Sequence, residues 1–322
     1  MKCLALMSGG LDSFLAIKVI QEQGIEVLAL NFQTPFCSAA GRSASCGDAV
    51  ALAGAQQIDL RVQFLGAEFL DLVAHPPHGW GRNMNPCIDC RILMLRRAKA
   101  LLEPSGASFV ITGEVVGQRP MSQHLAAMRT VEAESGLEGL LVRPLSAKLL
   151  PPTIPETKGW VDRERLLDLR GRSRKVQLAM AKALGLEYPP TPAGGCLLTD
   201  PAYAARLRDV LGHAGGLTAH LAQAVRFGRY VRLLPASFLM VGRNERDNAA
   251  LEGLQAADEW ILRPVNCVGP VVLGVGPLDE GSRAHAAGLL ARYADAPADG
   301  RVEIEARLGP AGEAVRLEGR KP

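Results

Sequence analysis

The chain of 322 residues has few aromatic side chains, little lysine and almost no net charge. Aromatic residues make up 5% of it, and only 8 of its 36 basic residues are lysine. A net charge of +3 excludes a strong attraction of the whole protein to polyanions, so any basic surface must be local. The shortage of aromatics argues against stacking platforms for single-stranded nucleic acid.

Long apolar runs are also missing, because no segment approaches the roughly 18 residues that span a bilayer. This predicts a protein without a membrane partner. Seven cysteines are an odd number, which argues against a secreted disulfide scaffold. The expected location is therefore the cytoplasm, and the cysteines become candidates for metal binding or catalysis.

Up to about residue 200, short apolar strands alternate with helical segments. Strands are predicted at 2–7, 26–32, 60–65, 109–112 and 139–145, and helices at 13–23, 47–57 and 88–103. This alternation predicts an α/β domain over 1–200, with a parallel sheet, helices on both faces, and ligands at the carboxyl ends of the strands.

The pattern changes from residue 201 onward. Helical stretches at 201–211 and 216–225 precede short strand candidates near 229–233, 238–241, 260–263 and 271–274, and a hairpin at 300–318. We therefore expect a second, smaller α+β domain over 201–322.

The first motif with chemical content is Ser8-Gly9-Gly10-Leu11-Asp12-Ser13, directly after the first strand. The glycines allow a sharp turn, and the N–H groups at the start of the following helix form an anion site. An acidic Asp12 inside an anion site is explained by a divalent cation that bridges it to phosphate. The spacing is not that of a Walker loop.

The second motif is a set of three cysteines. Cys87 and Cys90 lie at the start of a helix, whose dipole favours thiolates, and Cys196 follows the glycine-rich segment 192–195. Three thiolates suit an iron–sulfur cluster with one open iron, or a persulfide on one cysteine resolved by another. Packing roles for all three, and a zinc site completed by His75 or His78, remain open alternatives.

Together, these motifs resemble the PP-loop tRNA thiouridine synthases. The similarity rests on SGGLDS, NPCIDCRILMLRRAKAL, FVITGEVVGQRPMSQ, VRPLSAK and PAGGCLL, in this order, over roughly residues 1–200. The string from Thr112 to Gln118 is especially similar to 4-thiouridine synthases of the thiamine-biosynthesis type, and NPCIDC resembles the tRNA 2-thiouridylases. VGRNERDN, DEWILRP and Gly269-Pro270 resemble the NFACT-type RNA-binding domain.

The resemblance implies a Rossmann-like PP-loop fold of the adenine nucleotide alpha-hydrolase type, and ATP-dependent replacement of a uridine oxygen by sulfur. The implied cofactors are ATP, Mg²⁺ and a 4Fe–4S cluster on Cys87, Cys90 and Cys196. The implied nucleotide-binding residues are Ser8, Gly9, Gly10, Asp12, Ser13, Gly113 and Arg119, and the implied catalytic residues are Asp12, Cys90, Cys196 and Lys148. Glu114 would line the cleft, and Arg143 is a further candidate to neutralise phosphate charge.

The implied partners are tRNA and a sulfur donor, either a cysteine desulfurase or free sulfide. Basic residues between Arg163 and Lys175, and Arg91, Arg96, Arg97 and Lys99 after the CxxC motif, are candidates for contacts with RNA phosphates. The 4-position of uridine is favoured over the 2-position. A small-molecule acceptor, or a non-catalytic RNA-binding protein, are the alternatives, and the oligomeric state stays open, with a homodimer among the options.

Overall fold

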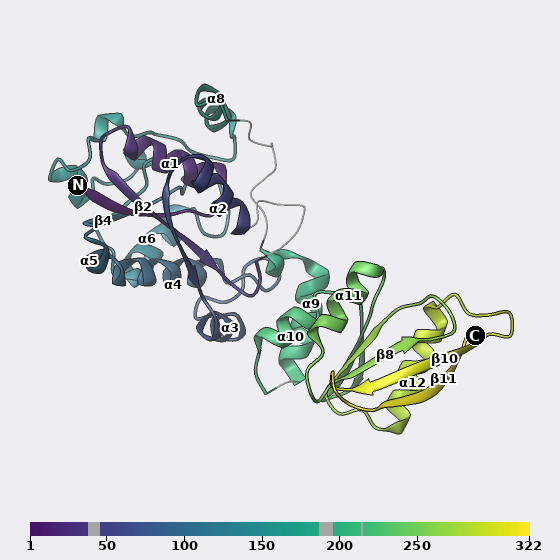
Figure 1. The fold of residues 1–322 in the computed structure, drawn as a ribbon. Helices are drawn as coiled ribbons and strands as arrows, with labels where there is room; N and C mark the ends of the chain where they lie inside the picture. Colours follow the sequence, from purple (N-terminus) through teal and green to yellow (C-terminus); the bar gives the residue numbers. More distant parts are fainter. Residues whose placement is uncertain (38–45, 187–195, 214) are drawn as a thin grey trace. The chain divides into compact units, whose positions relative to one another are not determined.

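The computed structural model describes residues 1–37, 46–186, 196–213 and 215–322, which form two compact units, Met1–Asp200 and Pro201–Pro322 (Figure 1). The segment 192–195 that precedes Cys196 lies outside the described residues. Each unit has a sheet of its own, and the two are described separately below.

The first unit contains a five-stranded, fully parallel sheet in the order β3-β2-β1-β4-β5. Its strands are β1 (Lys2–Leu6), β2 (Glu26–Gln33), β3 (Asp59–Phe64), β4 (Phe109–Thr112) and β5 (Leu141–Val142). The central strands β1, β2 and β4 are apolar almost throughout because both of their faces are covered, whereas the edge strand β3 is largely exposed.

Helices cover both faces of this sheet, with α1 and α2 on one side and α4 and α6 on the other (Figure 1). The helices of the unit are α1 (Leu11–Gln21), α2 (Cys46–Ala55), α3 (Ala67–Ala74), α4 (Cys87–Ala100), α5 (Leu102–Ser105), α6 (Leu125–Ser135), α7 (Ile154–Thr157) and α8 (Lys175–Ala183), with short 3₁₀ turns η1 (Ala147–Leu149), η2 (Arg163–Arg165) and η3 (Leu197–Thr199). Helix α1 packs between the sheet and α8, so Phe14 and Ile17 are fully buried.

The order of the strands determines where the sheet leaves a crevice for a ligand. The strand order changes direction between β1 and β4, since the chain first adds β2 and β3 on one side of β1 and then β4 and β5 on the other. Loops that leave the carboxyl ends of two such neighbouring strands separate and leave a crevice between them. The loop Ser8–Ser13 and the loop that begins at Gly113 leave the sheet at this point.

The second unit is an antiparallel six-stranded sheet in the order β11-β10-β8-β9-β7-β6. Its strands are β6 (Arg229–Leu234), β7 (Ser237–Val241), β8 (Trp260–Pro264), β9 (Val272–Val275), β10 (Arg301–Leu308) and β11 (Ala314–Arg320), and its helices are α9 (Pro201–His213), α10 (Ala219–Ala224), α11 (Glu245–Leu254) and α12 (Glu280–Tyr293). Alternate side chains of the strands pack with α12 to form the core.

The predicted fold class is confirmed: a parallel α/β unit precedes a smaller α+β unit. Among the longer helices, the sequence missed α3, α6, α8, α11 and α12. Helix α11 begins within the polar string VGRNERDN, where the Asn244 side chain accepts a hydrogen bond from the Asp247 amide and caps the helix. Within the described residues, no helix is long and apolar enough to cross a membrane.

Candidate nucleotide and thiol site

The loop Ser8–Ser13 is closed by hydrogen bonds between its own ends. The Ser13 hydroxyl donates to the Gly10 carbonyl at 2.8 Å, and the Ser8 amide donates to Ser13 Oγ at 3.3 Å. Gly9 has a φ of +78°, and a Cβ there would lie 2.9 Å from the Ala49 amide nitrogen. Gly10 gives α1 no side-chain cap, so the first amides of the helix remain available to an anion.

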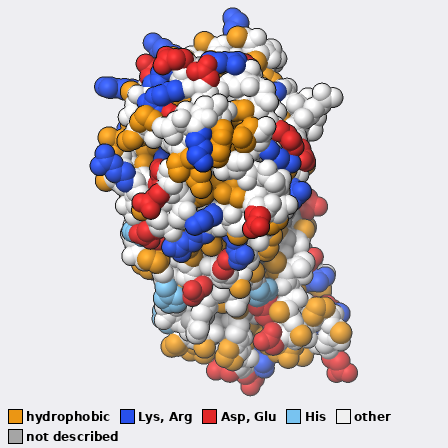
Figure 2. Space-filling model, turned by 90° about the vertical axis from the view of Figure 1, so that its left-hand side faces the viewer, with side chains coloured by type: hydrophobic (Ala, Val, Ile, Leu, Met, Phe, Trp, Pro, Cys, Tyr) orange, Lys and Arg blue, Asp and Glu red, His pale blue; other side chains and the backbone are white. Residues whose placement is uncertain are grey.

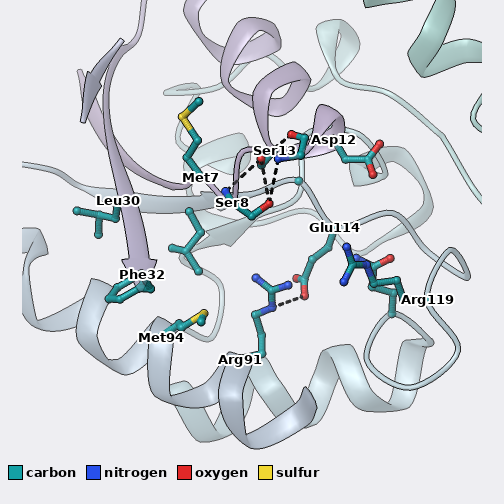
Figure 3. Close-up of a pocket in the computed structure, with 14 residues that line it drawn as sticks. Met7, Ser8, Asp12, Ser13, Leu30, Phe32, Arg91, Met94, Glu114 and Arg119 are labelled. Carbon is teal, nitrogen blue, oxygen red and sulfur yellow. Dashed lines mark hydrogen bonds and ion pairs between the residues drawn. The ribbon is translucent and has the colours of Figure 1, made fainter. Parts of the chain in front are cut away.

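A cleft lies between this loop and the carboxyl end of β4 (Figure 3). One wall is apolar and comes from β1, β2 and α4, with Met7, Leu30, Phe32 and Met94. The opposite wall is polar, with Ser8, Asp12, Ser13, Glu114, Arg119 and Gln123. The enclosed part measures about 90 Å³, which is room for about three water molecules. It therefore suits a phosphate-sized group, while a larger ligand would extend through the open mouth.

Buried acceptor atoms in the cleft lack hydrogen-bond donors. Asp12 Oδ1 and Gln123 Oε1 are shielded from solvent and accept no hydrogen bond from the described parts of the chain. A buried acceptor without a donor costs about 1–3 kcal/mol, so such atoms commonly mark a ligand position. Carboxylate and amide oxygens are ligands that Mg²⁺ accepts, and the cleft therefore fits a phosphate-bound magnesium ion beside Asp12.

The floor of the cleft is a buried ion network centred on Glu114. This carboxylate lies 3.3 Å from Arg91 Nε and 3.0 Å from Arg143 Nε, and it accepts a hydrogen bond from Thr112 at 3.1 Å. Burial alone would raise the pKa of Glu114, but the two arginines and these hydrogen bonds outweigh burial and hold the pKa below its ordinary value. Arg143 also contacts Glu132 at 2.6 Å and the Met128 carbonyl at 3.1 Å.

Replacing Glu114 with glutamine is expected to lower the free energy of unfolding by about 3 kcal/mol near neutral pH, because it leaves buried arginine charge uncompensated. The wild-type pKa lies below the ordinary 4.5, so the wild-type advantage is complete above pH 4.5 and disappears as the pH falls through the folded-state pKa. Denaturant unfolding of the wild type and Glu114→Gln at a series of pH values around 4.5 measures this difference in the free energy of unfolding. A difference that is the same at every pH would contradict the assignment.

The three cysteines of the sequence motifs gather beside this cleft. Cys87 and Cys90 occupy the first turn of α4, the helix that also carries Arg91 and Met94 into the cleft. Cys196 is close enough to both for their charges to repel one another, and all three are free thiols. The site therefore joins a set of three thiols to the phosphate loop through one helix.

Local backbone pairing explains how Cys196 reaches α4. The Met84 amide donates to the Leu198 carbonyl at 3.2 Å, and the Asn83 side chain donates to the Thr199 carbonyl at 2.7 Å. These bonds fasten the segment after Cys196 to the loop that leads into α4. On its other side, Cys196 forms an isolated β-bridge with Cys37, which is itself disulfide-bonded.

Burial raises the thiol pKa values in this set, to about 12 for Cys90 and about 11 for Cys196, and it also raises the pKa of Cys87. Arg91 and Arg119 oppose this increase at Cys87. The free thiols are thus protonated near neutral pH, and loading with a metal would release protons. As the described side chains stand, no three cysteine, histidine or acidic residues converge closely enough to hold a metal ion.

In chemical composition, the donor set matches a group that takes three thiolates and leaves one position open, because the three cysteines are free and interact with Arg91 or Arg119. Both histidines proposed as zinc ligands are engaged by carboxylates. His78 lies 2.7 Å from Asp89 and 3.0 Å from Glu134, and His75 lies 3.3 Å from Asp71.

Other candidates from the sequence lie elsewhere. Lys148 is on η1, where its ammonium group donates to the Glu164 carbonyl at 2.8 Å, and it does not line the cleft. Arg143 is buried in the ion network beneath the cleft rather than in its wall. Gly113 and Arg119 do line the cleft, and Arg119 interacts electrostatically with Cys87 and Asp12.

The basic stretches are partly used for structure. Arg163 pairs with Glu156, Arg97 pairs with Glu68, and Arg96 donates to the Glu134 carbonyl at 2.8 Å. Arg172, in contrast, is exposed in the loop before α8. On the face in Figure 2, basic side chains are interspersed with acidic ones, as the small net charge predicts.

Sequence reasoning did not assign Arg91, Met94 and Gln123 to the nucleotide cleft, and it took Arg91 for a contact with RNA. The signal for Arg91 and Met94 lay in their spacing from the cysteines: Arg91 comes four residues after Cys87 and Met94 four residues after Cys90, so each lies on the same side of the helix as one cysteine. Gln123 comes from the far end of the loop after β4, which the hydrogen bond from the Gly117 amide to its carbonyl closes at 2.6 Å.

The parallel sheet and the loop after its first strand resemble those of PP-loop proteins, and a second unit follows them. Residues 1–148 match the family described as thiamine biosynthesis protein (ThiI), and residues 228–315 match the family described as NFACT protein RNA binding domain. The resemblance that the motifs indicated is thereby confirmed for both parts of the chain.

Among curated proteins, the chain is 32% identical over 145 residues to the tRNA-specific 2-thiouridylase MnmA of Proteus mirabilis (strain HI4320), which covers 41% of this chain and 38% of that relative. The chain thus spans well under half of that protein. Similar solved structures include a 4-thiouridine synthetase–RNA complex with bound ATP (19% identity, TM-score 0.40, 70% of this chain and 53% of that one) and the U34-tRNA thiolase NcsA from Methanococcus maripaludis with its [4Fe-4S] cluster (17%, 0.35, 70% and 71%).

Proposed function

We propose that the protein is an ATP-dependent tRNA sulfurtransferase that adenylates a uridine carbonyl and replaces its oxygen with sulfur. The observation that carries the proposal is the placement of three free thiols beside the cleft of the loop Ser8–Ser13. Two of these thiols, Cys87 and Cys90, lie on α4, the helix that also lines this cleft. The matches to the ThiI family and to an RNA-binding domain supply the acceptor class.

In the first half-reaction, the loop Ser8–Ser13 and the amino end of α1 would hold the phosphates of ATP, and Asp12 would hold their Mg²⁺. The apolar wall with Leu30 and Phe32 would take the adenine ring. The uridine oxygen attacks the α-phosphorus, and the bond to the bridging oxygen breaks to release pyrophosphate. Arg119 and Arg91 are the cations in the cleft that can neutralise the developing charge.

In the second half-reaction, sulfide attacks the activated carbon and AMP leaves with the former carbonyl oxygen. A cluster held by Cys87, Cys90 and Cys196 would supply, when bound, an iron with an open position for sulfide. The chain's own contribution is to fasten Cys196 against the loop before α4 and to place Arg91 between the thiols and the cleft.

The second unit would hold the RNA. Several residues of its string VGRNERDN serve the fold: Asp247 accepts from the Gly228 and Arg243 amides, and Asn248 accepts from the Val271 amide at 3.0 Å. Exposed basic residues nearby, such as Arg246, are then the candidates for phosphate contacts, together with Arg172 in the first unit.

A nucleoside mass profile of tRNA from cells with and without the gene tests the proposal. We expect loss of 4-thiouridine, which the match to the ThiI family favours, and loss of a 2-thiouridine would assign the other carbon. An unchanged profile, with the gene expressed and no redundant enzyme present, would overturn tRNA thiolation and favour a small-molecule acceptor.

A further inference from the structure

The Asp12 carboxylate is held from one side only. Its Oδ2 accepts a hydrogen bond from Gln118 Nε2 at 2.6 Å. Its Oδ1 is buried and accepts no hydrogen bond from the described residues. One oxygen is therefore fixed by an amide, and the other is left for a ligand of the cleft that Asp12 lines.

The amide that fixes Asp12 is fixed in turn. A carboxylate can only accept, so the NH₂ group of Gln118 must face Asp12 and its carbonyl must face away. That carbonyl, Oε1, accepts a hydrogen bond from Gln177 Nε2 at 3.2 Å. Gln177 is 1% exposed and belongs to α8, which packs against α1, the helix that carries Asp12.

The two hydrogen bonds that link Gln177, Gln118 and Asp12 form only in one orientation of the Gln118 amide. If the Gln118 amide turned over, its carbonyl would face the Asp12 carboxylate and its NH₂ group would face the NH₂ group of Gln177. Two acceptors would then oppose each other at one end and two donors at the other, so both hydrogen bonds would be lost together. The donor from Gln177 thus supports the orientation of the Gln118 amide that Asp12 requires.

We propose that Gln177 is a positioning residue that acts through Gln118 to hold Asp12 with its Oδ1 directed at the magnesium ion of Mg·ATP. The proposal rests on the proposed function, since it takes the cleft to be a Mg·ATP site. Gln177 itself is not among the residues that line the cleft.

The test compares Gln177→Glu with Gln177→Met by calorimetric titration with Mg·ATP and, separately, with ATP in excess chelator. Glutamate has the shape of glutamine, but its carboxylate can only accept hydrogen bonds. In this variant the Gln118 amide therefore lies between two carboxylates. Methionine keeps the length and leaves the bond from Gln118 to Asp12 in place. We expect Gln177→Glu to lose about tenfold in Mg·ATP affinity. Its affinity for metal-free ATP should be unchanged. Gln177→Met removes the donor to Gln118 Oε1 without adding a charge, so it should lose about threefold in Mg·ATP affinity and also keep its affinity for metal-free ATP.

A double variant locates the effect. In Gln118→Met the donor to Asp12 is gone, so adding Gln177→Glu should cost no further Mg·ATP affinity, which is the signature of two residues acting in series. If Gln177→Glu lowers the midpoint of thermal unfolding, Gln118→Met is measured instead, because it adds no charge to the core. Gln118→Met must then lose the difference in affinity between Mg·ATP and metal-free ATP.

The outcomes separate the two proposals. A wild-type protein that binds no Mg·ATP overturns the proposed function. A wild-type protein that does bind it, with the magnesium-dependent gain intact in Gln177→Glu or in Gln118→Met, overturns the positioning role alone. Equal losses for Mg·ATP and metal-free ATP, or a larger loss in Gln177→Met than in Gln177→Glu, would assign Gln177 to packing.

Discussion

Replacing Cys196 with serine is expected to lower thiolation by at least about 100-fold, because a serine hydroxyl is neither a thiolate ligand nor a sulfur carrier. The same loss is expected for Cys90→Ser, since both thiols belong to the set beside the cleft. The fold should persist, as the segment after Cys196 is fastened through backbone atoms, including the Cys196 carbonyl that accepts from Thr199 Oγ1 at 2.7 Å. Quantifying thiouridine in tRNA treated with each purified variant measures the effect.

The matched control is Cys267→Ser, since Cys267 is a free, partly buried cysteine of the second unit. It should keep wild-type activity. ATP binding should also survive in Cys196→Ser, because Cys196 does not line the nucleotide cleft. Full thiolation by Cys196→Ser and Cys90→Ser would overturn thiol chemistry at this site, whereas equal losses in all three variants would point to general damage.

Gly113→Ala is expected to weaken ATP binding by about tenfold or more, since overpacking of a close contact costs about 1–3 kcal/mol. A Cβ at Gly113 would lie 2.5 Å from the carbonyl carbon and oxygen of Asp12 and would also meet the Ser13 amide nitrogen. These are backbone atoms of the phosphate loop, so the methyl group cannot be accommodated by turning a side chain. Titration with ATP and a thermal melt of the variant measure the consequence.

Gly54→Ala is the control for this substitution. Gly54 lies on α2, and within the described residues no atom beyond the neighbouring backbone of its own helix lies within 4 Å of the place that a methyl group there would take. Alanine should therefore keep ATP affinity and hold or slightly raise stability. If Gly113→Ala bound ATP as tightly as Gly54→Ala, the close packing of the β4 loop against Asp12 would not matter for the nucleotide.

Most strands could be predicted because the apolar pattern of their sequence matches the burial of their side chains. KCLAL and EVLALNFQ are apolar without alternation, which is what strands covered on both faces require, and they form β1 and β2. The edge strand β3 was also predicted, although it is largely exposed. Helix α12 was missed because its buried residues are mainly alanine. Helix α6 buries only two large apolar side chains, Met128 and Val131, so little apolar periodicity remains in either helix.

The residues of the candidate site also divide into those that the sequence could predict and those that it could not. Motifs continuous in the sequence, the loop Ser8–Ser13 and the pair Cys87 and Cys90, could be assigned from the backbone requirements of glycine and from the chemistry of thiols. Lys148 shows the limit of this reasoning. A motif placed it in the reaction, yet the structure engages its ammonium group with Glu164.

Local patterns in the chain determined the two-part α/β and α+β architecture and predicted the phosphate loop and the set of three cysteines, because these depend on periodicity, glycine geometry and residue chemistry. Long-range packing established the rest: Cys196 reaches α4, Arg91 turns to Glu114, and Gln177 steadies Gln118 against Asp12. Those contacts join segments far apart in the chain, and their geometry follows from the strand order and from how the helices pack, which no local pattern encodes.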